Sequence, residues 1–128
     1  MSQPDFKRPG SMEGPGRLSR LESAVLTAML KGEGGDFATL RTQLAKATVV
    51  SRTHSGVGFV TRIDVPDGIP VLAEAAGLSL RPVLAAHPHL SECAEFLLQV
   101  RAGRLAVLEA YCFEGGWPTD EAEFRVVG

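Results

Sequence analysis

The clearest hydrophobic pattern lies toward the C-terminus, where apolar and polar residues alternate over residues 94–100. One face of this segment is apolar: Ala94, Phe96, Leu98 and Val100. Arg101-Ala102-Gly103-Arg104 follows, and its glycine can adopt the positive φ that tight hairpin turns require. Residues 105–113 are then apolar on both faces, with Glu109 as the only charge. The pattern predicts a β-hairpin whose second strand is central in a sheet and covered by helix on one side.

Helical spacing of apolar residues predicts two short helices earlier in the chain. Ser19 and Glu22 have the spacing of a capping box, in which each side chain satisfies the other residue's free amide. An apolar stripe follows, and Gly32 is the expected C-cap. Asp36 is the expected N-cap of the second helix, whose apolar positions extend to Ala47. The short link between the two segments predicts a helical hairpin.

The period changes from helical to alternating at residue 48, and residues 48–53 and 58–65 predict two strands. A hairpin or bulged turn containing Gly56 and Gly58 joins them. No helix with free amides follows these glycines, as a phosphate-binding loop would require. We therefore interpret them as residues that permit a tight turn or a bulge next to packed backbone.

The segment between this hairpin and the C-terminal one has mixed signals. Residues 71–76 predict a short helical turn, and residues 78–85 predict a strand. Pro82 places that strand at a sheet edge, because proline cannot donate to the hydrogen-bond ladder. Residues 124–127 predict a final edge strand.

These elements predict an α+β protein in which an N-terminal helical hairpin packs on an antiparallel β-sheet. Residues 1–17 are rich in glycine and proline and poor in apolar residues, so we expect a disordered tail. Residues 18–128 are the length of one domain and are expected to form it.

The charge and the distribution of apolar residues limit the classes of function that fit this chain. The net charge is −2 and the pI is near 5.9, so no basic field attracts nucleic acid, and none is predicted as a partner. The chain has neither a secretory pattern at its start nor the roughly 20 consecutive apolar residues of a membrane span. A cytoplasmic location without membrane attachment is therefore expected, and Cys93 and Cys112 are predicted to be reduced, buried thiols.

Residues 51–61, Ser-Arg-Thr-His-Ser-Gly-Val-Gly-Phe-Val-Thr, resemble the S-R-E-x-T-G-V-G-F block of a family of small bacterial proteins of unknown function. A later E-G-aromatic block ending in W-P is similar to residues 108–113 followed by Trp117-Pro118. Thr53 stands where the family has glutamate, and Ala110 stands where it has glycine. The resemblance covers most of the chain and implies a shared fold but no activity.

Glu109 is the candidate for catalysis, because a carboxylate in an apolar strand must be paired, solvent-exposed or held neutral. A small enzyme would use Glu109 as acid or base together with His54 or the His87 and His89 pair. The alternative is structural: an ion pair, with Arg52 among the possible partners, or exposure on the open face of the sheet.

His87, His89 and Cys93 carry nitrogen and sulfur donors of the kind that bind zinc. Pro88 separates the histidines and indicates a loop in which they point in different directions. We interpret them as loop histidines beside a buried cysteine, and we predict no metal or other cofactor.

Trp117 either caps the core or projects as an interface anchor. Arg52, Tyr111 and Trp117 are the predicted binding residues. We predict a non-catalytic interaction module that binds a protein partner or a second copy of itself as a homodimer. In general outline only, small acidic α+β proteins of this kind resemble the immunity proteins that block bacterial toxins.

Overall fold

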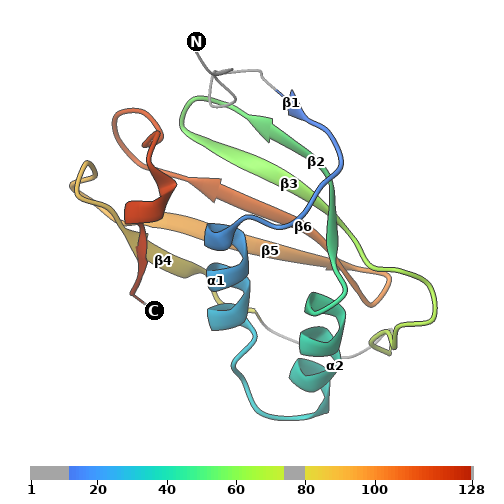
Figure 1. Cartoon of the computed structure of the whole chain (residues 1–128). Helices are drawn as coiled ribbons and strands as arrows, with labels where there is room; N and C mark the ends of the chain where they lie inside the picture. Colours follow the sequence, from blue (N-terminus) through green and yellow to red (C-terminus); the bar gives the residue numbers. More distant parts are fainter. Residues whose placement is uncertain (1–11, 74–79, 128) are drawn as a thin grey trace.

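The computed structural model describes residues 12–73 and 80–127, and Figure 1 shows the arrangement of their elements. The two helices are α1 (Arg20–Met29) and α2 (Gly35–Leu44), and a short 3₁₀ helix, η1, spans Glu121–Glu123. The strands are β1 (Met12–Glu13), β2 (Thr48–His54), β3 (Gly58–Asp64), β4 (Val83–Ala86), β5 (Ala94–Arg101), β6 (Arg104–Tyr111) and β7 (Arg125–Val126). They form one antiparallel sheet in the order β1-β2-β3-β6-β5-β4-β7.

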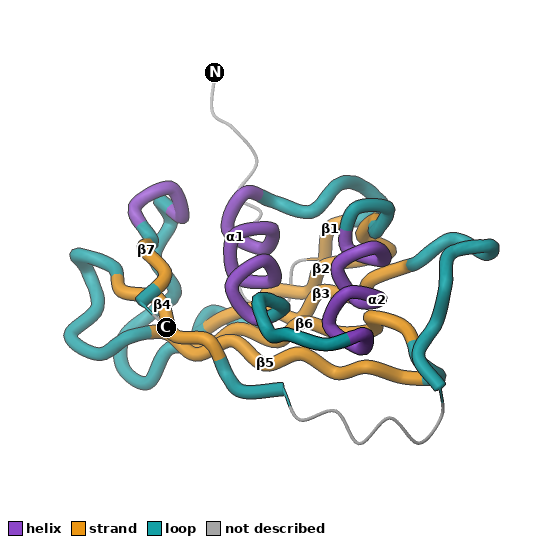
Figure 2. The backbone as a smooth tube through the Cα atoms, turned by 90° about the horizontal axis from the view of Figure 1, so that it is seen from below, coloured by secondary structure: helices purple, strands orange, loops and turns teal. Residues whose placement is uncertain are grey.

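Both helices lie on one face of this sheet (Figure 2), which confirms the predicted α+β class with helices packed on an antiparallel sheet. The α1 helix packs over β4 and β7, and α2 packs over β6. Leu26, Leu40, Phe96 and Leu108 are fully buried between the layers. The described residues place no helix or strand on the opposite face (Figure 2).

The capping box at the start of α1 is confirmed, because the Glu22 amide donates to the Ser19 hydroxyl and the Ser19 amide donates to the Glu22 carboxylate. The predicted caps that follow are wrong. The helix ends with Leu30 rather than Gly32 as its C-cap, and Gly34 rather than Asp36 is the N-cap of α2. Gly34 has a φ of 106°, which side chains rarely adopt, so backbone freedom decides this boundary.

The predicted C-terminal hairpin is confirmed: β5 and β6 pair up to Arg101 and Arg104. Ala102 and Gly103 form the two-residue loop, with φ values of 52° and 75°. Positive φ at both positions defines a type I′ turn, whose twist matches that of the flanking strands. Ala102 is the one non-glycine residue with positive φ in the described chain.

Replacing Ala102 by asparagine is therefore expected to raise the free energy of unfolding by about 0.5–1 kcal/mol, because asparagine adopts left-handed backbone at lower cost than alanine. Urea denaturation measures the change. Ala102→Val is the matched opposite, since a β-branched side chain is poorly tolerated there, and it is expected to lower the stability. Equal stabilities of the three proteins would contradict this account of the turn.

Gln43 ties α2 to the same turn although the two lie far apart in sequence. Its side chain is fully buried, and its amide nitrogen donates to the carbonyl oxygens of Pro70 and Gly103, both at 2.9 Å. Its amide oxygen accepts the backbone N–H of Leu105 at 2.9 Å. The hairpin is thus anchored at its closed end.

Two predictions about sheet edges need correction. Residues 12–16 of the predicted disordered tail are attached to the sheet, because β1 pairs with β2 and Gly16 exchanges backbone hydrogen bonds of 3.0 and 2.8 Å with Val49. Residues 1–11 of that tail lie outside the described residues. The strand after Pro82 is not an edge, because β7 pairs with the outer side of β4. Pro82 directly precedes the first residue of β4 and is outside its ladder.

Two further predictions concern a C-terminal edge strand and a helical turn at residues 71–76. The predicted edge strand at residues 124–127 corresponds to β7, which lies at the end of the sheet. Residues 71–73 have no regular structure, and residues 74–76 of the predicted helical turn lie outside the described residues.

Candidate functional site

The sheet face opposite the helices carries the alternate side chains of its central strands. In one row across the sheet, Val60 of β3 pairs with Glu109 of β6, which pairs with Leu97 of β5. In the next row, Tyr111 pairs with Glu95. Val60 is 40% exposed although it lies in the interior of the sheet. We call this the outer face and define it by Val60, Leu97, Glu109, Tyr111 and Glu95; Val60 is exposed and the other four side chains are half-buried.

An aromatic pair lies at one end of the outer face. The rings of Tyr111 and Phe113 meet edge to face with their centroids 5.3 Å apart, and Phe113 is 55% exposed. The Tyr111 hydroxyl donates to the Glu95 carboxylate at 2.8 Å. This hydrogen bond, together with the charges of Glu95 and Glu109, raises the pKa of Tyr111 above its ordinary value. The aromatic pair is therefore flanked by two carboxylates.

The structure does not bring Glu109 and His54 together. Glu109 lies on the outer face and accepts a hydrogen bond from the Gln99 side chain at 3.2 Å. His54 is buried on the helix side, where its ring lies against Phe59. Because the sheet separates them, the acid–base pair predicted for a small enzyme does not form.

A buried ionic network lies on the helix side and was not predicted as such. Its centre is Glu22, which is fully buried and accepts two hydrogen bonds from Arg52, at 2.8 Å from Nε and 2.5 Å from Nη2. The Thr61 hydroxyl and the Ser19 backbone N–H also donate to this carboxylate. Four donors, from the N-cap of α1, from β2 and from β3, thus converge on one buried charge.

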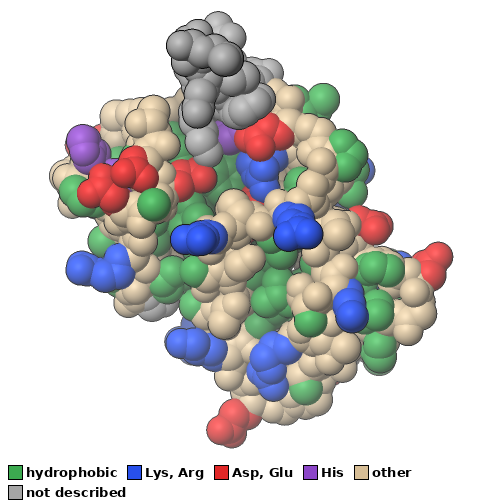
Figure 3. All heavy atoms as spheres, viewed as in Figure 1, with side chains coloured by type: hydrophobic (Ala, Val, Ile, Leu, Met, Phe, Trp, Pro, Cys, Tyr) green, Lys and Arg blue, Asp and Glu red, His purple; other side chains and the backbone are tan. Residues whose placement is uncertain are grey.

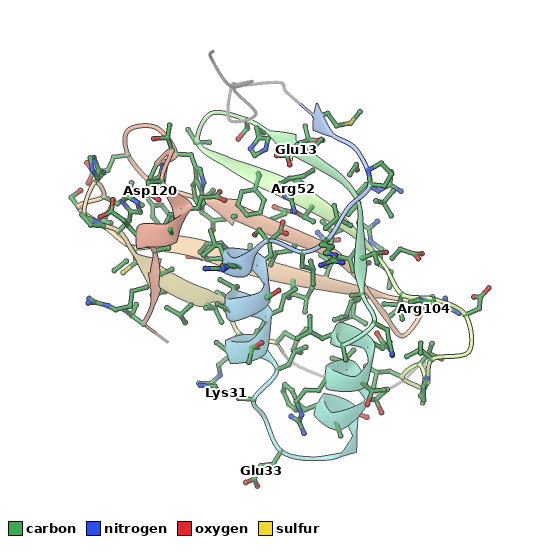
Figure 4. The ribbon with its side chains drawn as sticks, in the orientation of Figure 1. Glu13, Lys31, Glu33, Arg52, Arg104 and Asp120 are labelled. Atoms are coloured by element: carbon green, nitrogen blue, oxygen red, sulfur yellow. The ribbon has the colours of Figure 1, made fainter. Side chains whose placement is uncertain are left out.

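Arg52 extends the network to β1, as the neighbouring side chains of Arg52 and Glu13 in Figure 4 show. Its Nη1 donates to Glu13 at 2.8 Å, and the other Glu13 oxygen lies 2.5 Å from Nε2 of His54. Within the described chain, no buried side-chain nitrogen or oxygen lacks a hydrogen-bond partner. Arg52 and His54 therefore join β1, α1 and β2, and the binding role predicted for Arg52 stays a prediction.

The network shifts the pKa values of its carboxyl groups. Burial alone raises the pKa of Glu22, but hydrogen bonds from Arg52, Thr61 and Ser19 outweigh it, so the pKa lies below its ordinary value of 4.5. Burial also raises the pKa of Glu13, but the hydrogen bond from His54 and the charge of Arg52 outweigh burial, so this pKa too lies below its ordinary value. For Arg52, the carboxylates outweigh burial and raise its pKa.

Acidification is consequently expected to destabilise the protein. A carboxyl group with a lowered pKa in the folded state contributes stability above its unfolded pKa, and this contribution is lost as the pH falls through the folded value. The free energy of unfolding should therefore decrease as the pH is lowered below about 4.5, the ordinary value for both groups. Urea denaturation between pH 7 and pH 3 measures this decrease. In Glu22→Gln the slope should be shallower, and parallel curves for the two proteins would contradict the assignment.

Trp117 caps the core. It is only 7% exposed, and its ring packs at centroid distances of 5.5 Å on Phe59 and 5.0 Å on Phe124. Its indole N–H donates to Glu121 at 2.8 Å, which satisfies its one polar atom. This places Trp117 inside the domain and not on the binding surface predicted from the sequence.

The ring of His87 is buried and is hydrogen-bonded at both nitrogens. Its Nδ1 accepts the His89 backbone N–H at 3.0 Å, and its Nε2 lies 2.8 Å from the carbonyl oxygen of Asp120, to which it donates. No lone pair of this imidazole is free for a metal. Among the described residues, no group of three or more His, Cys, Asp and Glu side chains is arranged to hold a metal ion.

Both cysteines are free thiols. Cys112 is buried, as predicted, and its burial raises the pKa of its thiol above the ordinary value. Cys93 is only partly buried.

The chain matches no known protein family, no curated protein and no solved structure. The family resemblance carried by residues 51–61 and 108–113 therefore stays a prediction. None of the described helices is long and apolar enough to cross a membrane.

Proposed function

We propose that the protein is a non-catalytic protein-interaction module that binds its partner on the outer face of the sheet. One observation carries this proposal: the helices bury one face, whereas the other exposes Val60 and Phe113, with the half-buried Tyr111 against Phe113 and no described helix or strand over them. Exposed apolar side chains gathered on one face, with polar groups around them, are typical of protein-binding sites.

The placement of the chemically active side chains supports a binding role over a catalytic one. One hydrogen-bonded network on the helix side contains Glu22, Arg52 and His54. Both ring nitrogens of His87 form hydrogen bonds with backbone atoms. The outer face carries carboxylates and aromatic rings but no histidine, cysteine or serine next to Glu109 in the cross-strand rows. Recognition by shape and charge needs no such group.

Site-specific photo-cross-linking in the cells that produce the protein tests the proposal. Phe113 is replaced by p-benzoylphenylalanine, and Ala38, which is exposed on α2, is replaced in a matched control. We expect position 113 to yield an adduct of discrete mass that position 38 does not yield. An adduct of twice the chain mass identifies a second copy as the partner, and any other mass identifies a different protein. If position 113 yields no adduct, or the same adducts as position 38, the proposal is wrong.

A further inference from the structure

Charge is distributed unevenly along the strands that build the outer face. Residues 82–100 contain two carboxylates and no lysine or arginine, and residues 105–124 contain five carboxylates and again no lysine or arginine. Of these carboxylates, Glu95 and Glu109 lie on the outer face, whereas Glu121 and Glu123 belong to η1, which packs against α1 on the helix side. Because Glu95 pairs with Tyr111, the start of β5 and the end of β6 meet at one end of the sheet. The aromatic pair therefore lies beside the two carboxylates of the outer face, Glu95 and Glu109.

Most lysine and arginine side chains lie away from this end of the sheet, where Arg125 of the edge strand β7 pairs with Ala86. Lys and Arg side chains spread over the helical layer on the opposite side (Figure 3), where Arg20, Lys31, Arg41 and Lys46 are exposed. On the outer face, Arg62 pairs with Val107, one row beyond Glu109, and Arg101 lies at the hairpin turn. The outer face thus has an acidic, aromatic half at Tyr111, and toward the turn it carries Arg62 and Arg101 together with Asp64.

We propose that the partner presents lysine or arginine side chains to the acidic half of the outer face, formed by Tyr111, Phe113, Glu95 and Glu109. This inference rests on the proposed function and names the chemistry of its partner. A cation is attracted both by aromatic ring faces and by carboxylates. Complementary charge across an interface also speeds association and excludes partners of the wrong sign. The partner that fits this surface is a protein with a basic binding patch.

A synthetic octapeptide of alternating arginine and alanine serves as the probe, with an alternating glutamate–alanine peptide as its counterpart. Amide chemical shifts of the isotope-labelled full-length protein are followed by NMR during titration. We expect saturable shifts at Tyr111, Phe113 and Glu95 with the basic peptide only. In the Glu95→Gln/Glu109→Gln variant the Kd should rise at least fivefold. Tyr111→Phe should bind like wild type, because it keeps the ring, whereas Tyr111→Leu should bind more weakly.

A matched control tests whether the basic peptide is attracted simply by the net negative charge of the protein. Glu92→Gln/Glu123→Gln removes the same charge from exposed carboxylates outside the four-residue site and should leave the Kd within twofold of the wild-type value. Equal weakening in both double variants, or no saturable shift with the basic peptide, would overturn the inference. A cross-link from position 113 together with no basic-peptide binding would leave the proposed function standing and refute only the basic partner.

Discussion

Replacing Arg52 by leucine is expected to lower the free energy of unfolding by about 3–5 kcal/mol, the cost of leaving a buried charge without its partner. Glu22 is fully buried, and Arg52 supplies two of the four hydrogen bonds that its carboxylate accepts. The substitution also releases Glu13 and thereby loosens β1. Urea denaturation followed by circular dichroism measures the loss at pH 7.

Two variants separate the ion pair from the loss of a long side chain. Arg62→Leu removes an arginine from the outer face of the neighbouring strand and should change the stability by no more than about 0.5 kcal/mol. The double variant Glu22→Leu/Arg52→Leu should be more stable than Arg52→Leu alone, because it removes the buried charge as well. An Arg52→Leu cost no larger than that of Arg62→Leu would show that the network contributes little.

Gly58→Ala is the second substitution for which we expect a large effect, a loss of about 3 kcal/mol. A Cβ atom at Gly58 would lie 1.8 Å from the carbonyl oxygen of Ala110 and 2.8 Å from the Cα of Tyr111. Both obstacles are backbone atoms, so relief requires β3 and β6 to move apart where they pair. Thermal and urea denaturation measure the loss.

Gly14→Ala provides the matched control, because no atom of the described residues lies within 4 Å of the Cβ it would add. Its stability should stay within about 0.5 kcal/mol of the wild-type value. Similar losses for both glycine variants would contradict close packing at Gly58 as the cause, because Gly→Ala by itself stabilises a protein through the entropy of the unfolded chain. The short distance to Ala110 agrees with the interpretation, made from the sequence, that Gly58 lies next to packed backbone.

The elements that could be predicted from the sequence are those set by neighbouring residues. Ser19 and Glu22 are three residues apart and form the capping box, and Gly103 adopts the positive φ its position in the hairpin requires. The alternating pattern of residues 94–100 likewise reports directly which side chains share a face. Local chemistry decides such features, so a single sequence contains enough information to predict them.

The ionic network could not be predicted in this way, because its members are far apart in the chain. Glu22 and Arg52 are separated by 30 residues, and Glu13 and His54 by 41. One signal was present: Glu22 lies on the same helical stripe as the buried Val25, Leu26 and Met29. A carboxylate on an apolar stripe predicts a buried partner, although not which arginine supplies it.

Of the three predicted binding residues, Tyr111 alone lies on the outer face. The segment from residue 105 to 113 is apolar on both faces, so periodicity could not show which side the helices cover. Arg52 and Trp117 lie on the helix side, where Arg52 joins the network and Trp117 caps the core. The order of the strands decides which side chains face the helices and which face outward. That order depends on pairings between strands that are distant in sequence, such as β3 with β6.

The central claim, that the outer face is the binding surface, is tested most directly by the adduct yield at position 113 in a Val60→Lys background. Val60 is 40% exposed and pairs with Glu109, so lysine is tolerated there and the free energy of unfolding should stay within about 1 kcal/mol of the wild-type value. We predict a folded variant whose cross-linked adduct falls at least tenfold. An undiminished adduct in the folded variant would contradict the claim.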